Sequence, residues 1–79
     1  MRYSLETKLE SEKVKQRALA YFKDELGLKV TSDEGNTLCL EGGGGHVTLL
    51  VCPGDKTRIE IETQEWYRAV TQFMTKIRR

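Results

Sequence analysis

Residues 47–62 read VTLLVCPGDKTRIEIE, and this stretch indicates the fold more strongly than any other. Leu49 and Val51 lie two positions apart, and so do Ile59 and Ile61. A period of two is that of a β-strand with one buried face. The intervening Pro-Gly-Asp-Lys favours a turn, because proline presets φ and glycine permits positive φ. The stretch therefore predicts an antiparallel hairpin with Val51 opposite Ile59 and Leu49 opposite Ile61.

Three further strands precede this hairpin. The alternation of apolar and polar residues predicts strands at 2–7, 28–31 and 37–41. Residues 32–36, Ser-Asp-Glu-Gly-Asn, form a turn cluster between the second and third of them. The four glycines at 42–45 predict a flexible hairpin loop, because glycine imposes no backbone conformation.

The apolar residues of these strands can share one face of a sheet. Pairing Leu40 with Val47 places Leu38 opposite Leu49. The preceding turn is expected to place Val30 opposite Leu38. The register thus predicts an antiparallel sheet with one buried face.

Residues 11–26 have the pattern of an amphipathic helix. Ser11 is the expected N-cap, and Gly27 is the expected left-handed residue at the C-terminal end. The apolar stripe at helical spacing is formed by Val14, Ala18, Tyr21, Phe22 and Leu26.

A second helix is predicted over residues 64–78. Thr63 is the expected N-cap, and Glu65 would lie in the first turn, where negative charge suits the helix dipole. Its apolar stripe is formed by Trp66, Val70, Phe73 and Ile77.

The order β-α-β-β-β-β-α predicts a single α+β domain over residues 1–79, a two-layer sandwich with both helices on one face of an antiparallel sheet. This order resembles the helix-grip arrangement shared by TATA-binding-protein repeats and START-type ligand carriers. The resemblance covers nearly the whole chain and lies in architecture, without a shared residue motif. It implies two possible uses of the fold. The exposed sheet face can bind DNA, or the space between sheet and long helix can hold an apolar ligand.

The core decides between a filled interior and a ligand pocket. We expect the second helical stripe to pack on the inner face of the sheet, formed by Val30, Leu38, Leu40, Leu49, Val51, Ile59 and Ile61. That packing uses almost every large aliphatic residue. The alternative is a small-molecule carrier with a pocket under the C-terminal helix, lined by Trp66, Tyr67, Phe73 and Met74.

Composition excludes several classes of protein. The chain is 38% hydrophobic and 32% charged with a net charge of +1, which is unlike a disordered chain. No apolar run approaches the ~18–20 residues of a membrane helix, so no membrane partner is expected. The N-terminus lacks the apolar segment of a signal peptide, which predicts a cytoplasmic protein with Cys39 and Cys52 as reduced thiols.

Few residues suggest metal binding or catalysis. Cys39, His46 and Cys52 offer three zinc ligands, but the spacing Cys-x6-His-x5-Cys matches no strong metal motif. His46 is the only histidine, and Glu60 and Glu62 alternate on an exposed face rather than forming an acid/base pair. We therefore expect no catalytic residues, no metal and no cofactor, and no enzymatic activity.

Nucleic acid is disfavoured as a partner. The predicted outer sheet face carries four carboxylates against three cations, and an acidic face repels phosphate. Lys76, Arg78 and Arg79 supply positive charge at the C-terminal helix, and together with the first helix they form a weaker candidate surface.

The leading functional hypothesis is a non-catalytic binding or protein-interaction module. The predicted outer face has a mildly apolar strip around Leu50, flanked by Thr37, Cys39, Thr48 and Cys52. That strip, or an edge strand, could associate with a second copy of the chain or with another protein.

Overall fold

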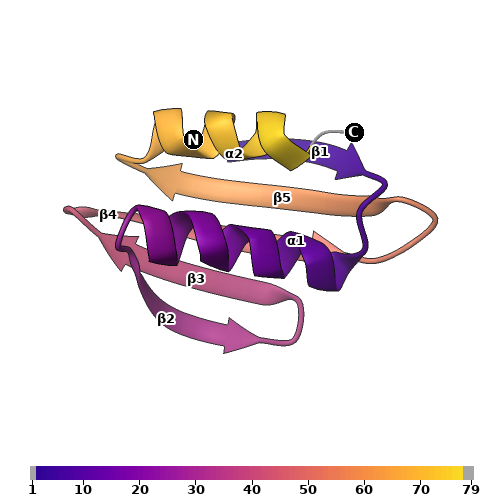
Figure 1. Ribbon diagram of the computed structural model, residues 1–79, viewed down its shortest axis with the longest axis horizontal. Coiled ribbons are helices and arrows are strands. Elements are labelled where there is room, and N and C mark those ends of the chain that lie inside the picture. Colours follow the sequence, from indigo (N-terminus) through magenta and orange to yellow (C-terminus); the bar gives the residue numbers. More distant parts are fainter. Residues whose placement is uncertain (1, 78–79) are drawn as a thin grey trace.

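The computed structural model describes residues 2–77, in which two helical segments lie on one side of a five-stranded sheet (Figure 1). The α+β class and the predicted order of elements are confirmed. In chain order the elements are β1 (Arg2–Thr7), α1 (Ser11–Ala18), η1 (Leu19–Glu25), β2 (Lys29–Glu34), β3 (Thr37–Gly42), β4 (Gly45–Cys52), β5 (Thr57–Gln64) and α2 (Tyr67–Ile77).

The sheet has the order β1-β5-β4-β3-β2, and every neighbouring pair is antiparallel. β4 is therefore the central strand, and β1 and β2 are the edges. In Figure 1, α1 lies in front of the β3–β4 side of the sheet and α2 in front of the β5–β1 side. We call the side that packs against the helices the inner face, and the opposite side the outer face.

The predicted register of the three central strands is confirmed. Leu40 pairs with Val47 and Leu38 with Leu49. Leu49 also pairs with Ile61 across β4 and β5. Alternation alone was sufficient here, because a slip by one residue would turn every apolar side chain of a strand to the wrong face.

The predicted register of β2 is wrong. Val30 pairs with Leu40 rather than Leu38, and Leu38 pairs with Asp33. A bulge at Thr31 inserts one extra residue, which moves the remainder of β2 to the opposite alternation. The strand consequently runs on to Glu34, and the connection to β3 shrinks to Gly35 and Asn36. Gly35 has φ of 56°, as the first position of a type II′ hairpin turn requires.

The glycine run is a tight turn rather than a flexible loop. Gly42 and Gly45 pair with each other as the last residues of the ladder between β3 and β4. Gly43 and Gly44 form the two-residue connection, with φ of 57° and 81°. Positive φ at both central positions is the requirement of a type I′ turn. Gly45 has an ordinary φ, but a Cβ there would overlap the carbonyl oxygen of Gln64.

The C-terminal helix begins three residues later than predicted. Thr63 is not an N-cap; it lies in β5, is 1% exposed, and donates from Oγ1 to the carbonyl oxygen of His46 at 2.8 Å. Glu65 precedes the helix and has φ of 75°. Trp66 also precedes it, and its Nε1 donates to the carbonyl oxygen of Gly42 at 2.8 Å. Position 78, the predicted end, lies outside the described residues.

The first helix changes its winding at its midpoint. α1 is α-helical, whereas η1 has the wider π-type winding, in which the Leu26 N–H donates to the carbonyl of Tyr21 at 3.1 Å. Ser11 is the first helical residue and Glu10 is the N-cap, so the predicted cap is one residue too late. The predicted end is confirmed, because Gly27 has φ of 76°.

The core fills the space between the two layers. The predicted inner-face residues other than Val30 are buried, as are Val70, Phe73 and Ile77 of α2. Val30, Trp66 and Leu26 are partly buried. Three inner-face threonines were not predicted to be buried. Each donates its hydroxyl to a backbone carbonyl, as Thr7 does to Ile77, Thr57 to Leu9 and Thr63 to His46.

Candidate functional site: the outer face of the sheet

No helix covers the outer face of the sheet. In β5 the inner residues Thr57, Ile59, Ile61 and Thr63 are buried, and the four residues between and after them are exposed. The cross-strand register arranges the outer side chains in rows, of which those through Thr48 and Leu50 cross all the strands of the sheet. The face is therefore a continuous surface, and its chemistry changes from one edge to the other.

The half of the outer face formed by β1 and β5 carries long charged side chains. Arg2 pairs with Glu62 across the two strands, with Nε 3.4 Å from Oε2. Glu6 lies opposite Arg58, and Glu60 lies between Arg58 and Glu62 on β5. All five residues are exposed. We call this half the charged half. It contains a smaller hollow of about 230 Å³, lined among others by Arg2, Glu60 and Glu62.

The other half, formed by β2, β3 and the glycine turn, carries mostly short side chains. It contains a hollow of about 930 Å³. The residues that line the hollow are Lys29, Thr31, Ser32, Cys39, Leu40, Glu41, Gly42, Gly44, Gly45, His46 and Thr48. We call this half the hollow half. The Thr31 bulge lies at its edge, where a bulge increases the local twist of the sheet.

Leu50 occupies the central strand between the two halves. It lies on β4 with Thr37 of β3 on one side and Glu60 of β5 on the other. Leu50 is 38% exposed, and Leu50 and Tyr67 are the large hydrophobic residues of the described chain that are exposed. The strip predicted around Leu50 is present, since Thr37, Cys39, Thr48 and Cys52 are all partly exposed on this face.

The charge of the outer face leans further towards negative than the sequence suggested. The bulge in β2 places Glu34 opposite Thr37, on the outer face. Asp33 moves to the inner side, where its Oδ1 accepts from Lys15 Nζ of α1 at 2.6 Å. With Glu34 included, the face carries five carboxylates against three cations, and phosphate would be repelled.

The structure separates the three candidate zinc ligands. Cys39 pairs with Thr48, whereas Cys52 pairs with Arg58 at the far end of β4. Cys52 follows Thr48 by four positions along β4, which amounts to ~13 Å. Both cysteines are free thiols. Within residues 2–77, no group of three or more His, Cys, Asp or Glu side chains is placed to hold a metal ion.

Cys39 and His46 are diagonal neighbours on adjacent strands, since Cys39 lies opposite Thr48 and His46 opposite Glu41. Diagonal positions are ~7–8 Å apart, beyond direct hydrogen bonding of short side chains. Within residues 2–77 no hydrogen bond joins the two side chains. Glu60 and Glu62 lie two positions apart on the charged half of the outer face, and both are exposed, as predicted.

The helix side is largely filled. Phe73 packs between Phe22 and Tyr21, with ring centroids 5.1 Å and 6.1 Å away. The Tyr21 hydroxyl donates to Gln72 Oε1 at 3.0 Å, and burial together with the charge of Glu25 raises the pKa of Tyr21 above its ordinary value. A surface groove of about 180 Å³ lies between η1 and α2. That volume is below the ~300 Å³ of a small ligand pocket.

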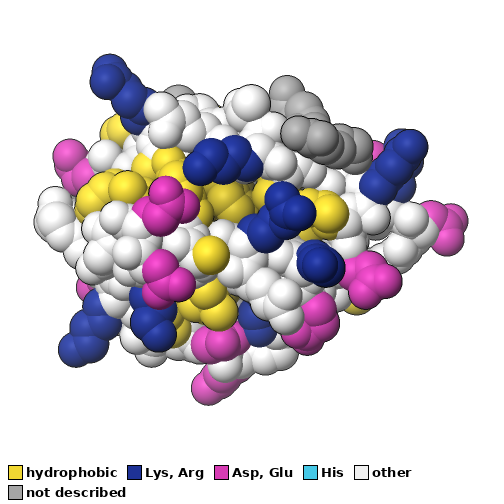
Figure 2. Space-filling model, in the orientation of Figure 1, with side chains coloured by type: hydrophobic (Ala, Val, Ile, Leu, Met, Phe, Trp, Pro, Cys, Tyr) yellow, Lys and Arg dark blue, Asp and Glu magenta, His cyan; other side chains and the backbone are white. Residues whose placement is uncertain are grey.

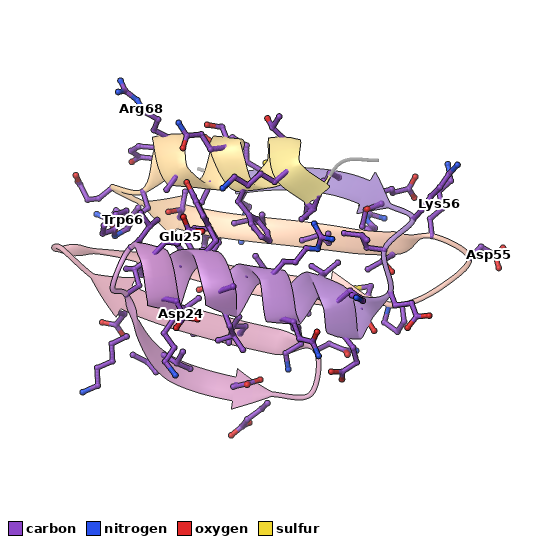
Figure 3. All side chains as sticks on the ribbon, in the orientation of Figure 1. Asp24, Glu25, Asp55, Lys56, Trp66 and Arg68 are labelled. Carbon is purple, nitrogen blue, oxygen red and sulfur yellow. The ribbon has the colours of Figure 1, made fainter. Side chains whose placement is uncertain are left out.

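The surface over the helices is mixed in charge. Figure 2 shows Lys and Arg side chains interspersed with Asp and Glu around a strip of hydrophobic atoms. In Figure 3, Asp24 and Glu25 extend from the first helical segment, and Arg68 extends from the start of α2. Trp66 lies at one end of the molecule, and Asp55 and Lys56 lie at the other. Of the candidate basic residues, Lys76 lies over the Tyr21 ring at 4.4 Å, and positions 78 and 79 are outside the described residues.

Comparisons with known proteins give no family for this chain. No protein-family model matches the sequence, and no curated protein matches it significantly. Within residues 2–77, the helices are too short or too polar to cross a membrane.

Proposed function

We propose that this chain is a non-catalytic protein-interaction module that binds its partner with the outer face of the sheet. The observation that carries the proposal is the arrangement of that face. Both helical segments cover the inner face, and the outer face has an uncharged strip along β4 and β3 around the exposed Leu50, bordered by Glu60 and Glu62 of the neighbouring β5 and by the charged residues of the edge strands. An uncharged centre with a polar rim is the usual anatomy of a protein interface.

The face supports this proposal better than either edge strand does. β2 is an edge interrupted by the Thr31 bulge, and Lys29 and Glu34 lie near its ends. The β1 edge carries Arg2 and Glu6. Bulges and charged side chains are the devices that keep edge strands from pairing with other chains.

Two further statements belong to the proposal. The two helical segments on one face of an antiparallel sheet support a helix-grip architecture, in which the opposite face is open to a partner. A cytoplasmic location also belongs to the proposal, and it is compatible with Cys39 and Cys52, which are too far apart to form a disulfide with each other.

Site-specific photo-crosslinking tests the proposal in cells that produce the protein. A photo-reactive residue at Thr48, on the outer face, is expected to give covalent adducts larger than the monomer. The same residue at Thr71, exposed on α2, is the matched control and should give none. Adding Leu50→Glu to the Thr48 probe should reduce the adduct yield about tenfold, because it places a charge in the apolar centre. Equal yields at both positions, or none at either, would contradict the proposal.

A further inference from the structure

We infer that the outer face binds a basic segment of another protein, and that one Lys or Arg side chain of this segment enters the smaller hollow beside Leu50. This inference rests on the proposed function and specifies the chemistry of the partner. Its basis is that three features meet in one row of the sheet. They are an exposed apolar side chain, a hollow next to it, and two carboxylates that have no cation opposite them.

The row through Leu50 crosses all five strands. From β1 to β2 it consists of Ser4, Glu60, Leu50, Thr37 and Glu34. Its two carboxylates lie on opposite sides of the exposed leucine, and both are exposed. Each of them has only uncharged neighbours within the row, so the row presents negative charge at two points around an apolar centre.

The other charges of the outer face are balanced. Each of the three remaining carboxylates lies directly opposite a cation, in the pairs Arg2–Glu62, Glu6–Arg58 and Lys29–Glu41. Glu60 and Glu34 are therefore the source of the excess negative charge. Within residues 2–77, no hydrogen bond or ion pair joins either of them to another side chain. A partner that covers this row has to supply cations, because a carboxylate buried without one is costly.

The smaller hollow suits a basic side chain. It measures about 230 Å³, and its lining includes Thr48, Leu50, Glu60 and Glu62. Leu50 offers apolar contact to the methylene stem of a Lys or Arg, and Glu60 can accept hydrogen bonds from the charged end. Glu62 already pairs with Arg2, with 3.4 Å between Oε2 and Nε, so Glu60 is the acceptor left for the partner.

The distance between the two carboxylates specifies the bound segment. Glu60 and Glu34 are three strands apart in the row, which amounts to ~14 Å at ~4.8 Å per strand. Residues i and i+4 of an extended chain are ~13 Å apart and point to the same side. We therefore expect the pattern Lys/Arg-x-apolar-x-Lys/Arg, laid across the strands with its apolar residue over Leu50 and Thr37.

NMR titration of the isotope-labelled full chain with synthetic peptides tests the inference. The probe is Arg-Thr-Leu-Thr-Arg with both ends blocked. It should shift the amide resonances of Leu50 and Glu60 with a Kd on the order of millimolar, because exposed ion pairs are weak. Glu-Thr-Leu-Thr-Glu should leave these resonances unchanged. Arg-Thr-Ser-Thr-Arg should bind several-fold more weakly, because it lacks the apolar contact.

Substitutions in the chain give the reciprocal test. Glu60→Gln and Glu34→Gln should each weaken binding of the arginine peptide ~3-fold. Glu6→Gln is the matched control, since Glu6 is an exposed carboxylate of the same face that lies opposite Arg58 and outside the Leu50 row. Replacing both Glu60 and Glu34 by lysine should reverse the preference, so that the glutamate peptide binds more tightly than the arginine peptide.

The outcomes separate this inference from the proposed function. Resonances that stay unshifted up to about ten times the expected Kd overturn the basic partner, and so does equal binding of the arginine and glutamate peptides. Crosslinks from Thr48 to another protein would then still support an interaction module. Equal losses from Glu6→Gln and Glu60→Gln would overturn the assignment to the Leu50 row. Circular dichroism verifies that the variants fold, and the comparison of peptides on the wild-type chain needs no variant.

Discussion

Replacing Phe73 by alanine is expected to lower the free energy of unfolding by ~3–5 kcal/mol. Phe73 is 1% exposed, and its ring packs 5.1 Å from that of Phe22 and 6.1 Å from that of Tyr21. Truncation would leave a cavity at the contact between the two helical segments. A chain of 79 residues has roughly 4–12 kcal/mol of stability in total, so the variant should be largely unfolded or close to it.

Urea unfolding followed by circular dichroism measures this loss. Tyr67→Ala is the matched control, because Tyr67 is an aromatic residue of the same helix that is 41% exposed. Its cost should stay within about 0.5 kcal/mol. If Phe73→Ala unfolds at the same urea concentration as the wild type, the core between the layers is assigned incorrectly.

Replacing Gly45 by alanine is expected to cost ~3 kcal/mol, since overpacking against backbone leaves no flexible neighbour to yield. The added methyl would overlap the Gln64 carbonyl oxygen and lie 2.6 Å from Cβ of Glu65. These residues connect β5 to α2, and the Trp66 indole that follows them is hydrogen-bonded to Gly42. The substitution should therefore separate the glycine turn from the start of the C-terminal helix.

Gly44→Ala provides the contrast within the same turn. Nothing lies within 4 Å of a Cβ at that position, and the cost there comes from its φ of 81°. Left-handed backbone costs an L-residue ~1–2 kcal/mol. Calorimetric melting of both variants gives the comparison. A Gly44→Ala variant less stable than Gly45→Ala would show that φ, and not the close approach of Gln64, governs the turn.

The alternation of apolar residues predicted most of the sheet because it follows from burial of one face. The pairs Leu40–Val47, Leu49–Ile61 and Val51–Ile59 are found as expected. The same rule gave the wrong register for β2, because the bulge at Thr31 reverses the alternation of inner and outer side chains. An isolated polar stretch such as Thr-Ser-Asp-Glu has no apolar residue that would reveal such a change.

The start of the C-terminal helix was missed because threonine suits two positions. Thr63 is a good N-cap residue, but it is also β-branched and in phase with Ile59 and Ile61. The tertiary contact decides, since the Thr63 hydroxyl bonds the His46 carbonyl across the sheet. The sequence did contain a signal for the longer strand, because Thr63 continues the period of two set by Ile59 and Ile61.

The sequence predicted which residues lie on the outer face, but not how the surface is shaped. The sequence placed Leu50 there with small neighbours and an excess of carboxylates, and the structure agrees. The division into a charged and a hollow half depends on which strands are neighbours, and β1 joins the sheet beside β5, far from it in sequence. Local patterns do not determine that non-local pairing, so the two halves can be distinguished only in the folded chain.

Solvent accessibility of methyl groups, measured by NMR with an inert paramagnetic probe, tests most directly whether the outer face is the surface that becomes covered. As extract of the producing cells is added to the isotope-labelled protein, relaxation of the Leu50 methyls by the probe should fall. Relaxation of the methyls of Thr71 and Thr75, exposed on α2, should stay unchanged at every addition. Leu50 methyls that remain as accessible as those of Thr71 throughout would contradict the account.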